Sequence, residues 1–229
     1  MILAGVLLKL GGYGVFRVFS LLDFFYVGFD LYVFFFILWG GVITRVVCLR
    51  QVDLKSLVAY SSIGHMAILF CGYYVGSTSG CSGRLIMMVG HGLCSSCLFV
   101  LSSMGYDLMG SRRVYLVKGM MTLFPSLAFW WFLFCSANIA APTSLNLAAE
   151  LLIFIGLLGK RFFSFFFLGL ISFFVGAYSL YLFLSFNHGN LLEGGGYYFF
   201  GGVLRYFIFF LRFFFLFFSF LVLDLFLVF

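Results

Sequence analysis

Long apolar stretches, separated by short polar or glycine-rich breaks, run through this sequence from one end to the other. A helix that crosses a bilayer needs about 20 consecutive, mostly apolar residues, and the chain supplies such stretches repeatedly. Of its 229 residues 65% are hydrophobic and 9% are charged, whereas about a quarter are charged in a typical soluble domain. The sequence therefore predicts an all-α polytopic membrane protein, not a soluble domain with an anchor.

The apolar stretches predict about seven transmembrane helices, of which one is discontinuous, within a single transmembrane domain covering 1–229. The connections between them are too short for an independent soluble domain, a flavin site or a nucleotide site. No signal peptide is expected, because the start carries neither a basic segment nor a small-residue cleavage site. The expected helices span 1–22, 31–50, 55–76, 83–104, 120–156, 162–186 and 203–229.

The basic residues lie mostly near the predicted helix ends, and they give a formal net charge of +6. Without a soluble domain to carry a basic patch, contact with lipid headgroups is a better interpretation than nucleic-acid binding. The orientation in the membrane stays open, because basic loops are expected on both sides. The residues interpreted in this way are Arg45, Arg50, Arg112, Arg113, Lys118, Lys160 and Arg161.

The six cysteines fall mostly inside apolar stretches. Cys94-x-x-Cys97 has no second pair and no histidine pair at zinc spacing, so small residues that pack between helices are the favoured interpretation. A disulfide framework and a metal site are not expected.

The predicted helix 120–156 is too long and too polar at its centre for a simple span. Pro142 removes a backbone donor and clashes with the preceding turn. A broken helix is tolerated at membrane depth only inside protein or beside a wet cavity, and transporters use such breaks at ion sites. A mild proline kink is the alternative, but Glu150 in the same segment favours the break. The side chains expected to satisfy the freed backbone groups are Asn138, Thr143, Ser144 and Asn146.

Four ionisable residues lie inside four separate apolar stretches: Lys9, His65, His91 and Glu150. A charged side chain at membrane depth is costly, so each one is a functional hypothesis by default. Histidine exchanges protons near neutral pH, and a desolvated lysine can do so too. Together they predict a proton relay, taken in chain order as a row from Lys9 through His65 and His91 to Glu150.

Each member of this row has a plainer interpretation. Lys9 lies near a helix end and could extend to the interface. His91 could be a structural histidine bonded to a backbone carbonyl, although the glycines on both sides of it favour close approach of another helix or of water. Glu150 could be a neutral, hydrogen-bonded acid that stabilises the break.

Further polar residues surround His65 in the sequence. Ser61 and Ser62 share a helical face with it at i+4 and i+3 spacing, which predicts a polar stripe. Lys55, beside Arg50 and Asp53, is best interpreted as an interfacial lysine in an ion-pair cluster.

Four strings in this order resemble the antiporter-like membrane subunits of mitochondrial NADH:ubiquinone oxidoreductase (complex I), and among them the subunit-4 family, over residues 1 to about 185. A glutamate at position 150 favours subunit 4 over the paralogous subunit 5, which usually has lysine there. Relatives of this family occur in cation/proton antiporters and membrane-bound hydrogenases. The strings are LAGVLLKLGGYG, CLRQVDLKSLVAYSSIGHMA, GHGLCSSCLF and AFWWFLFCSANIAAPTSLNLAAELLIF.

The resemblance implies a proton-translocating subunit of the complex I membrane arm. In it, Lys9 corresponds to the lysine that links two half-channels, His65 and His91 to the histidines of the following polar helices, and Glu150 to the acidic group of the second broken helix. Flavin, iron–sulfur clusters and quinone are expected in other subunits, and no cofactor in this chain. The expected partners are the paralogous subunits 2 and 5, an N-terminal half of subunit 4, and lipids.

The family carries about fourteen helices in two inverted repeats, and this chain matches only part of them. We expect 1–22 to be the last helix of the first repeat, 31–186 the second repeat and 203–229 a C-terminal helix. A fragment, a trimmed chain and one product of a split gene are three open explanations. The expected location is the mitochondrial inner membrane, and residue usage rich in Phe and Gly with few Pro, Gln, Thr and Lys suggests mitochondrial encoding. A sodium/proton antiporter subunit and a structural scaffold are the alternative functions.

Overall fold

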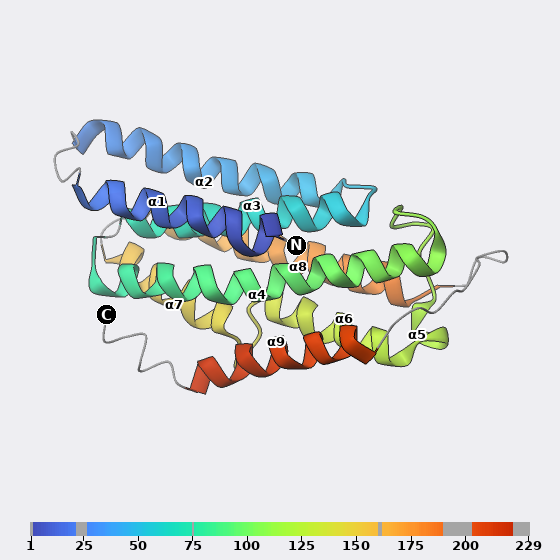
Figure 1. The fold of residues 1–229 in the computed structure, drawn as a ribbon. Coiled ribbons are helices and arrows are strands. Elements are labelled where there is room, and N and C mark those ends of the chain that lie inside the picture. Colours follow the sequence, from blue (N-terminus) through green and yellow to red (C-terminus); the bar gives the residue numbers. More distant parts are fainter. Residues whose placement is uncertain (1, 22–26, 75, 160–161, 190–202, 222–229) are drawn as a thin grey trace.

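The structure, a computed structural model, describes residues 2–21, 27–74, 76–159, 162–189 and 203–221. Within these ranges the regular structure is helical, apart from one isolated bridge between Asp53 and Arg113. The long helices lie side by side along one common direction and form an elongated bundle (Figure 1). The predicted all-α polytopic fold class is confirmed.

The described part of the chain begins with one short π-helical segment, η1, which continues directly into α1. Of the helices that follow it, α2, α3, α4 and α8 are long and apolar enough to cross a membrane. The exact number of seven spans is not confirmed. The helix bounds are η1 Leu3–Leu7, α1 Leu8–Leu21, α2 Val27–Leu49, α3 Leu54–Tyr73, α4 Thr78–Met109, α5 Met120–Leu123, α6 Pro125–Asn138, α7 Leu145–Leu158, α8 Ser164–Asn187 and α9 Val203–Leu221.

Helix α4 occupies the middle of the bundle and contacts η1, α3, α6, α7 and α9. Its predicted range, 83–104, was too short at both ends. Ser77 caps the N-terminus, because its hydroxyl accepts a hydrogen bond from the Gly80 amide at 3.2 Å. Gly110 ends the helix in the left-handed conformation, at φ 66°.

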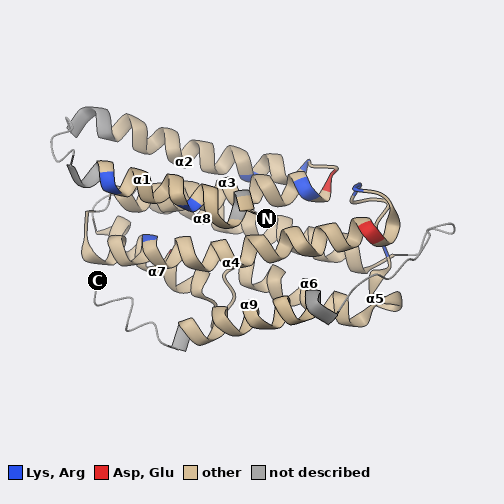
Figure 2. Ribbon diagram, in the orientation of Figure 1, with Lys and Arg blue, Asp and Glu red and all other residues tan. Residues whose placement is uncertain are grey.

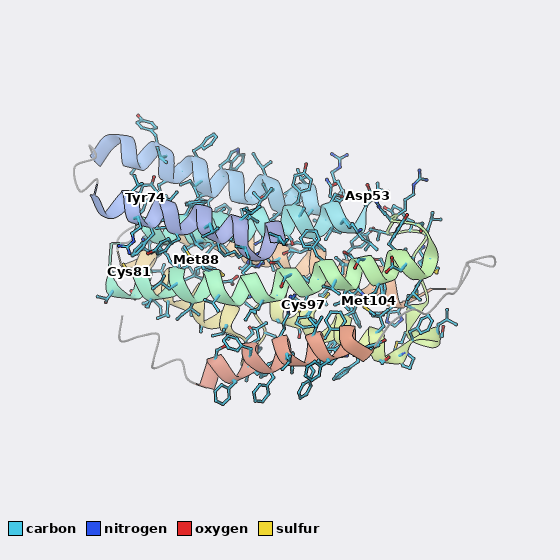
Figure 3. The ribbon with its side chains drawn as sticks, in the orientation of Figure 1. Asp53, Tyr74, Cys81, Met88, Cys97 and Met104 are labelled. Atoms are coloured by element: carbon cyan, nitrogen blue, oxygen red, sulfur yellow. The ribbon has the colours of Figure 1, made fainter. Side chains whose placement is uncertain are left out.

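Helices α3 and α4 run antiparallel. Figure 3 labels Asp53, just before α3, at one end of the bundle, and Tyr74 and Cys81 at the other end. Cys97 and Met104 follow along α4 back toward the end at which Asp53 lies. The midpoints of the two helices therefore lie close together, and these midpoints carry the polar residues described below.

The predicted break in the fifth span is present. Helices α6 and α7 both pack on α4, and the irregular segment that joins them lies near the middle of the bundle (Figure 1). This segment contains Pro142 and two non-glycine residues with positive φ, Ala140 at 63° and Thr143 at 75°. Such a conformation is unfavourable for residues with a Cβ, so the break is held in place by its surroundings.

Two of the four polar side chains named for the break stabilise its backbone. Asn146 donates from Nδ2 to the Ala137 carbonyl in the last turn of α6, at 2.9 Å. Ser144 is the N-cap of α7 and accepts a hydrogen bond from the Leu147 amide at 3.4 Å. Asn146 therefore joins the two halves of the broken span. Thr143 only bonds the neighbouring Pro142 carbonyl, and Asn138 bonds elsewhere, as described below.

Candidate functional site

Charged residues are sparse along the described helices, and most of the ribbon carries none (Figure 2). Several cluster around the connection between α2 and α3 and the segment that follows α4, at one end of the bundle. The interior nevertheless holds a group of buried polar side chains from α2, α3, α4 and α7. They are Arg45, His65, His91, Asn146 and Glu150.

The two histidines lie against each other, although they belong to α3 and α4. Their ring centroids are 4.5 Å apart, and both side chains are 0% exposed. Nδ1 of His65 lies 3.6 Å from Oε1 of Glu150. This distance exceeds a hydrogen bond, but it places an imidazole nitrogen and a carboxylate oxygen next to each other in the interior.

Lys9 approaches the other side of the histidine pair. A Cβ atom added to Gly92 would lie 3.3 Å from Cε of Lys9, so the lysine side chain lies against α4 next to His91. His91 in turn lies against His65, and His65 approaches Glu150. The order in space is therefore Lys9, His91, His65 and Glu150. The row taken in chain order had the two histidines exchanged.

The glycines beside His91 permit close packing, which confirms the interpretation of their role. A Cβ on Gly90 would lie 2.8 Å from Oδ1 of Asn146 and 3.0 Å from Cβ of Leu145, at the start of α7. A Cβ on Gly92 would meet the η1 backbone at the Gly5 carbonyl, 3.5 Å away. The two glycines thus bring the broken helix and the segment that carries Lys9 to opposite sides of His91.

Many polar atoms of this group have no hydrogen-bond partner among the described residues. A buried polar group without a partner costs about 1–3 kcal/mol, and water is the usual partner in such places. A row of these atoms suits a path along which hydrogen bonds and protons are exchanged. The atoms are Nε and Nη2 of Arg45, both ring nitrogens of His65 and of His91, Oδ1 of Asn138 and Asn146, and Oε1 of Glu150.

The other polar residues that were singled out on α3 are Ser61, Ser62 and Lys55, and they differ in their surroundings. Ser61 and Ser62 are buried with His65, but each hydroxyl donates to a carbonyl of its own helix, at 2.7 and 2.6 Å. Lys55 lies at the first turn of α3 and places Nζ 5.4 Å from the centre of the Tyr106 ring. The described contacts include no ion pair between Lys55 and Asp53; the contact they give for Lys55 is this cation–π contact.

Arg45 lies near a helix end, as expected, but its interpretation as a cation that contacts lipid headgroups was wrong. The residue lies within the last two turns of α2, yet it is 0% exposed. Its Nη1 donates to the Tyr178 hydroxyl at 2.5 Å, and Nδ2 of Asn138 donates to the same oxygen at 3.1 Å. A charged residue inside the predicted span 31–50 was already an indication of function, but its nearness to the helix end favoured the interfacial interpretation.

The cysteines and the remaining basic residues lie outside this group of buried polar side chains. All six cysteines are free thiols, and Cys94 packs through its thiol on the Phe134 carbonyl at 3.4 Å, as expected of a residue that packs between helices. Arg112 and Arg113 are exposed, in agreement with an interfacial position. Lys160 and Arg161 lie outside the described residues, as does 222–229, the last part of the predicted span 203–229.

A profile of the family described as NADH:quinone oxidoreductase/Mrp antiporter, TM matches residues 1–176. Among curated proteins, NADH-ubiquinone oxidoreductase chain 4 of Lumbricus terrestris is 46% identical over 192 residues, which cover 84% of this chain and 42% of that protein. The protein of the same name from Locusta migratoria is 45% identical over 85% of this chain and 44% of its own length. The chain therefore spans less than half the length of these relatives.

Two solved structures are similar in fold. A chain of respiratory complex I from Thermus thermophilus with bound NADH superposes with a TM-score of 0.74, at 20% identity, over 80% of this chain and 39% of that one. A chain of the Mrp complex from Dietzia sp. DQ12-45-1b gives a TM-score of 0.60, at 17% identity, over 68% of this chain and 31% of that one. At these identities the likeness concerns the fold alone.

Proposed function

Because the chain belongs to the NADH:quinone oxidoreductase/Mrp antiporter transmembrane family, we propose that it translocates protons as part of the membrane arm of respiratory complex I. In this proposal the chain supplies one half-channel and part of the central polar axis. Electron transfer from NADH to ubiquinone takes place in other subunits, and its energy drives proton movement along the row.

One observation carries the proposal: three helices bring His91, His65 and Glu150 together in the interior, and half-buried Lys9 lies against α4 at the residue next to His91. The contacts that support it are the stacking of His91 on His65 at 4.5 Å and the approach of His65 to Glu150 at 3.6 Å. A proton that arrives at His91 can pass to His65 and then from Nδ1 to the carboxylate of Glu150. Lys9 is the donor or acceptor at the other end of the row.

The remaining roles follow from the family. We propose that 1–22 is the last helix of a first repeat, that 31–186 forms the second repeat and that 203–229 is a C-terminal helix. The partners would be the other membrane-arm subunits, especially the paralogous subunits 2 and 5, and the N-terminal half of the same subunit. The location would be the mitochondrial inner membrane, with the chain encoded in mitochondrial DNA and no redox cofactor held by it.

The proposal is tested on the assembled membrane complex that contains this chain, reconstituted in vesicles. We expect Glu150→Gln and His91→Ala to lower NADH-driven proton translocation while NADH oxidation continues. Ser61→Ala is the matched control, because Ser61 is buried near the row but its hydroxyl bonds only to its own helix. Unchanged translocation in both row variants would refute the proposal.

A sodium/proton antiporter subunit is the alternative, since the Mrp complex shares this fold. The same vesicles distinguish the two functions. Proton uptake that NADH drives without sodium supports the complex I role. Proton movement that requires a sodium gradient and ignores NADH supports the antiporter role.

A further inference from the structure

Helix α1, which carries Lys9, is attached to the bundle along a narrow face. Of residues 8–18, whose burial the structure describes, only Gly12 is buried, and Lys9 and Phe16 are half-buried. These three residues follow one another at spacings of three and four, so they lie on one side of the helix. The contacts that this chain supplies to α1 are therefore concentrated on the side from which Lys9 extends.

Tyr73, the last residue of α3, binds α1 at the buried glycine. Its hydroxyl donates a hydrogen bond to the Gly12 carbonyl at 2.6 Å, and the residue is 3% exposed. A Cβ on Gly12 would lie 3.1 Å from Cε of Met88 on α4, so the backbone of α1 lies close to both neighbouring helices here. Because Gly12 lies one helical turn from Lys9, this hydrogen bond holds the part of α1 that carries the lysine.

Arg84, in the second turn of α4, lies against the Tyr73 ring. Its Cζ is 4.4 Å from the centre of that ring and 5.0 Å from the centre of the Phe16 ring. The side chain packs across Gly72, where a Cβ would lie 2.7 Å from Cγ of Arg84. Arg84 is 5% exposed, and a cation–π contact is strongest where the cation is desolvated. The guanidinium therefore joins an aromatic ring of α3 to one of α1.

Tyr73 and Arg84 thus form a clamp that ties α1 to α3 and α4, the helices beside which it lies (Figure 1). The clamp matters for Lys9 because a lysine ammonium group sits on a flexible four-carbon stem. Such a group is positioned only as well as the backbone turn that carries it. A shift of α1 along α4 would move Lys9 away from Gly92 and so from His91.

We propose that Tyr73 and Arg84 are positioning residues of the proton path, which fix the height of α1 on α4 and so keep Lys9 beside His91. The proposal rests on the proposed function, because it concerns the placement of Lys9 in the same row. Tyr73 and Arg84 themselves take no part in proton transfer.

The position of α1 on α4 is measured by a cross-link between Gly5 and Ser96. A Cβ on Gly5 would lie 3.7 Å from Cβ of Ser96, close to the separation of about 3.8 Å that is typical of disulfides. Gly5→Cys combined with Ser96→Cys should therefore form a disulfide when the assembled complex is oxidised with copper–phenanthroline. We expect this reaction to be slower when Tyr73→Phe or Arg84→Met is added, and Arg84→Lys, which keeps the cation, to retain more of the rate than Arg84→Met.

Two controls accompany the cross-link. Tyr13→Phe removes a hydroxyl that accepts a hydrogen bond only within α1, from Nε of Arg17 at 2.8 Å, so the cross-linking rate should stay as in wild type. Gly5→Cys alone, analysed by mass spectrometry of the linked peptides, detects any disulfide to a native cysteine.

Proton translocation in vesicles shows whether the clamp acts by positioning. Tyr73→Phe keeps the ring that Arg84 contacts and removes only the hydroxyl. We expect it to lower NADH-driven translocation by about tenfold, because a displacement of about 1 Å in a reacting group can cost about 10²-fold. Complete closure of the disulfide between Gly5→Cys and Ser96→Cys should restore translocation in Tyr73→Phe, and dithiothreitol should abolish this rescue. A general loss of stability would not produce a rescue that depends on the reductant.

Three results would overturn the positioning role: cross-linking at the wild-type rate in Tyr73→Phe and Arg84→Met, unchanged translocation in Tyr73→Phe, or a loss that the closed disulfide does not repair. Failure of the proposed function is recognised separately in Lys9→Met. Normal translocation in Lys9→Met refutes the place of Lys9 in the proton path and the positioning role with it. Lost translocation in Lys9→Met, together with wild-type cross-linking in the clamp variants, overturns the positioning role alone.

Discussion

His65 and Glu150 come from different helices of the bundle, and Nδ1 of one lies 3.6 Å from Oε1 of the other. This approach requires the break between α6 and α7, because the break brings the first turns of α7 against Gly90 of α4. The strained segment and the buried acid are thus two parts of one arrangement. Features of this kind persist only where the surrounding structure holds them.

The position of Glu150 depends on the close contact at Gly90. In Gly90→Ala, the added Cβ would meet Oδ1 of Asn146 at 2.8 Å and Cβ of Leu145 at 3.0 Å. We expect a loss of about 1–3 kcal/mol in stability from overpacking, seen as a lower melting temperature of the complex. The control is Gly40→Ala, where nothing lies within 4 Å. Equal melting temperatures for the two variants would contradict the packing described.

Asn146 is expected to hold the two half-helices together. Asn146→Ala removes the hydrogen bond to the Ala137 carbonyl, which still accepts from the Ala140 amide, so we expect a cost of about 0.5–1.5 kcal/mol. Hydrogen exchange of the amides between α6 and α7 should become faster. Ser136→Ala is the control, since its hydroxyl bonds only to a carbonyl of its own helix. Exchange that is unaltered in Asn146→Ala would show that the break needs no such link.

The sequence predicted the broken span correctly, because Pro142 and several polar side chains interrupt the apolar pattern that a continuous membrane helix would show. It also identified the role of the glycines around His91. The length of α4 was missed because the cap at Ser77 and the end at Gly110 lie outside the most apolar part of the segment. Hydrophobic patterns reveal apolar segments better than they reveal helix ends.

The arrangement of the site could be predicted only in part. The four ionisable residues were identifiable, because each one interrupts an apolar stretch. Their order in space was not, since it depends on which helices pack together, and periodicity within one helix does not determine this. Arg45 was misinterpreted for the same reason: its burial depends on Gly64 and Tyr178, which belong to other helices.

The two lysines of the predicted site are expected to differ in importance. Lys9 packs beside His91, whereas Lys55 lies over the Tyr106 ring at one end of α3. We expect Lys9→Met to lower NADH-driven proton translocation and Lys55→Met to leave it within about twofold of wild type, in accord with the small energy of an exposed cation–π contact. Equal rates for the two variants, measured with a pH-sensitive dye in vesicles, would contradict a role for Lys9 in the row.

The most direct test of the row is a double-mutant cycle on His65 and Glu150. It measures both the rate of NADH-driven proton translocation and the number of protons translocated per electron from NADH. If the two residues act in series, His65→Ala and Glu150→Gln should each slow proton transfer by about 10²-fold or more, the scale of a positioned acid or base. The double variant should then be no slower than the worse single variant, because residues that act as a unit are not additive. A wild-type proton-to-electron ratio in either single variant, or losses that multiply in the double variant, would contradict a shared path through His65 and Glu150.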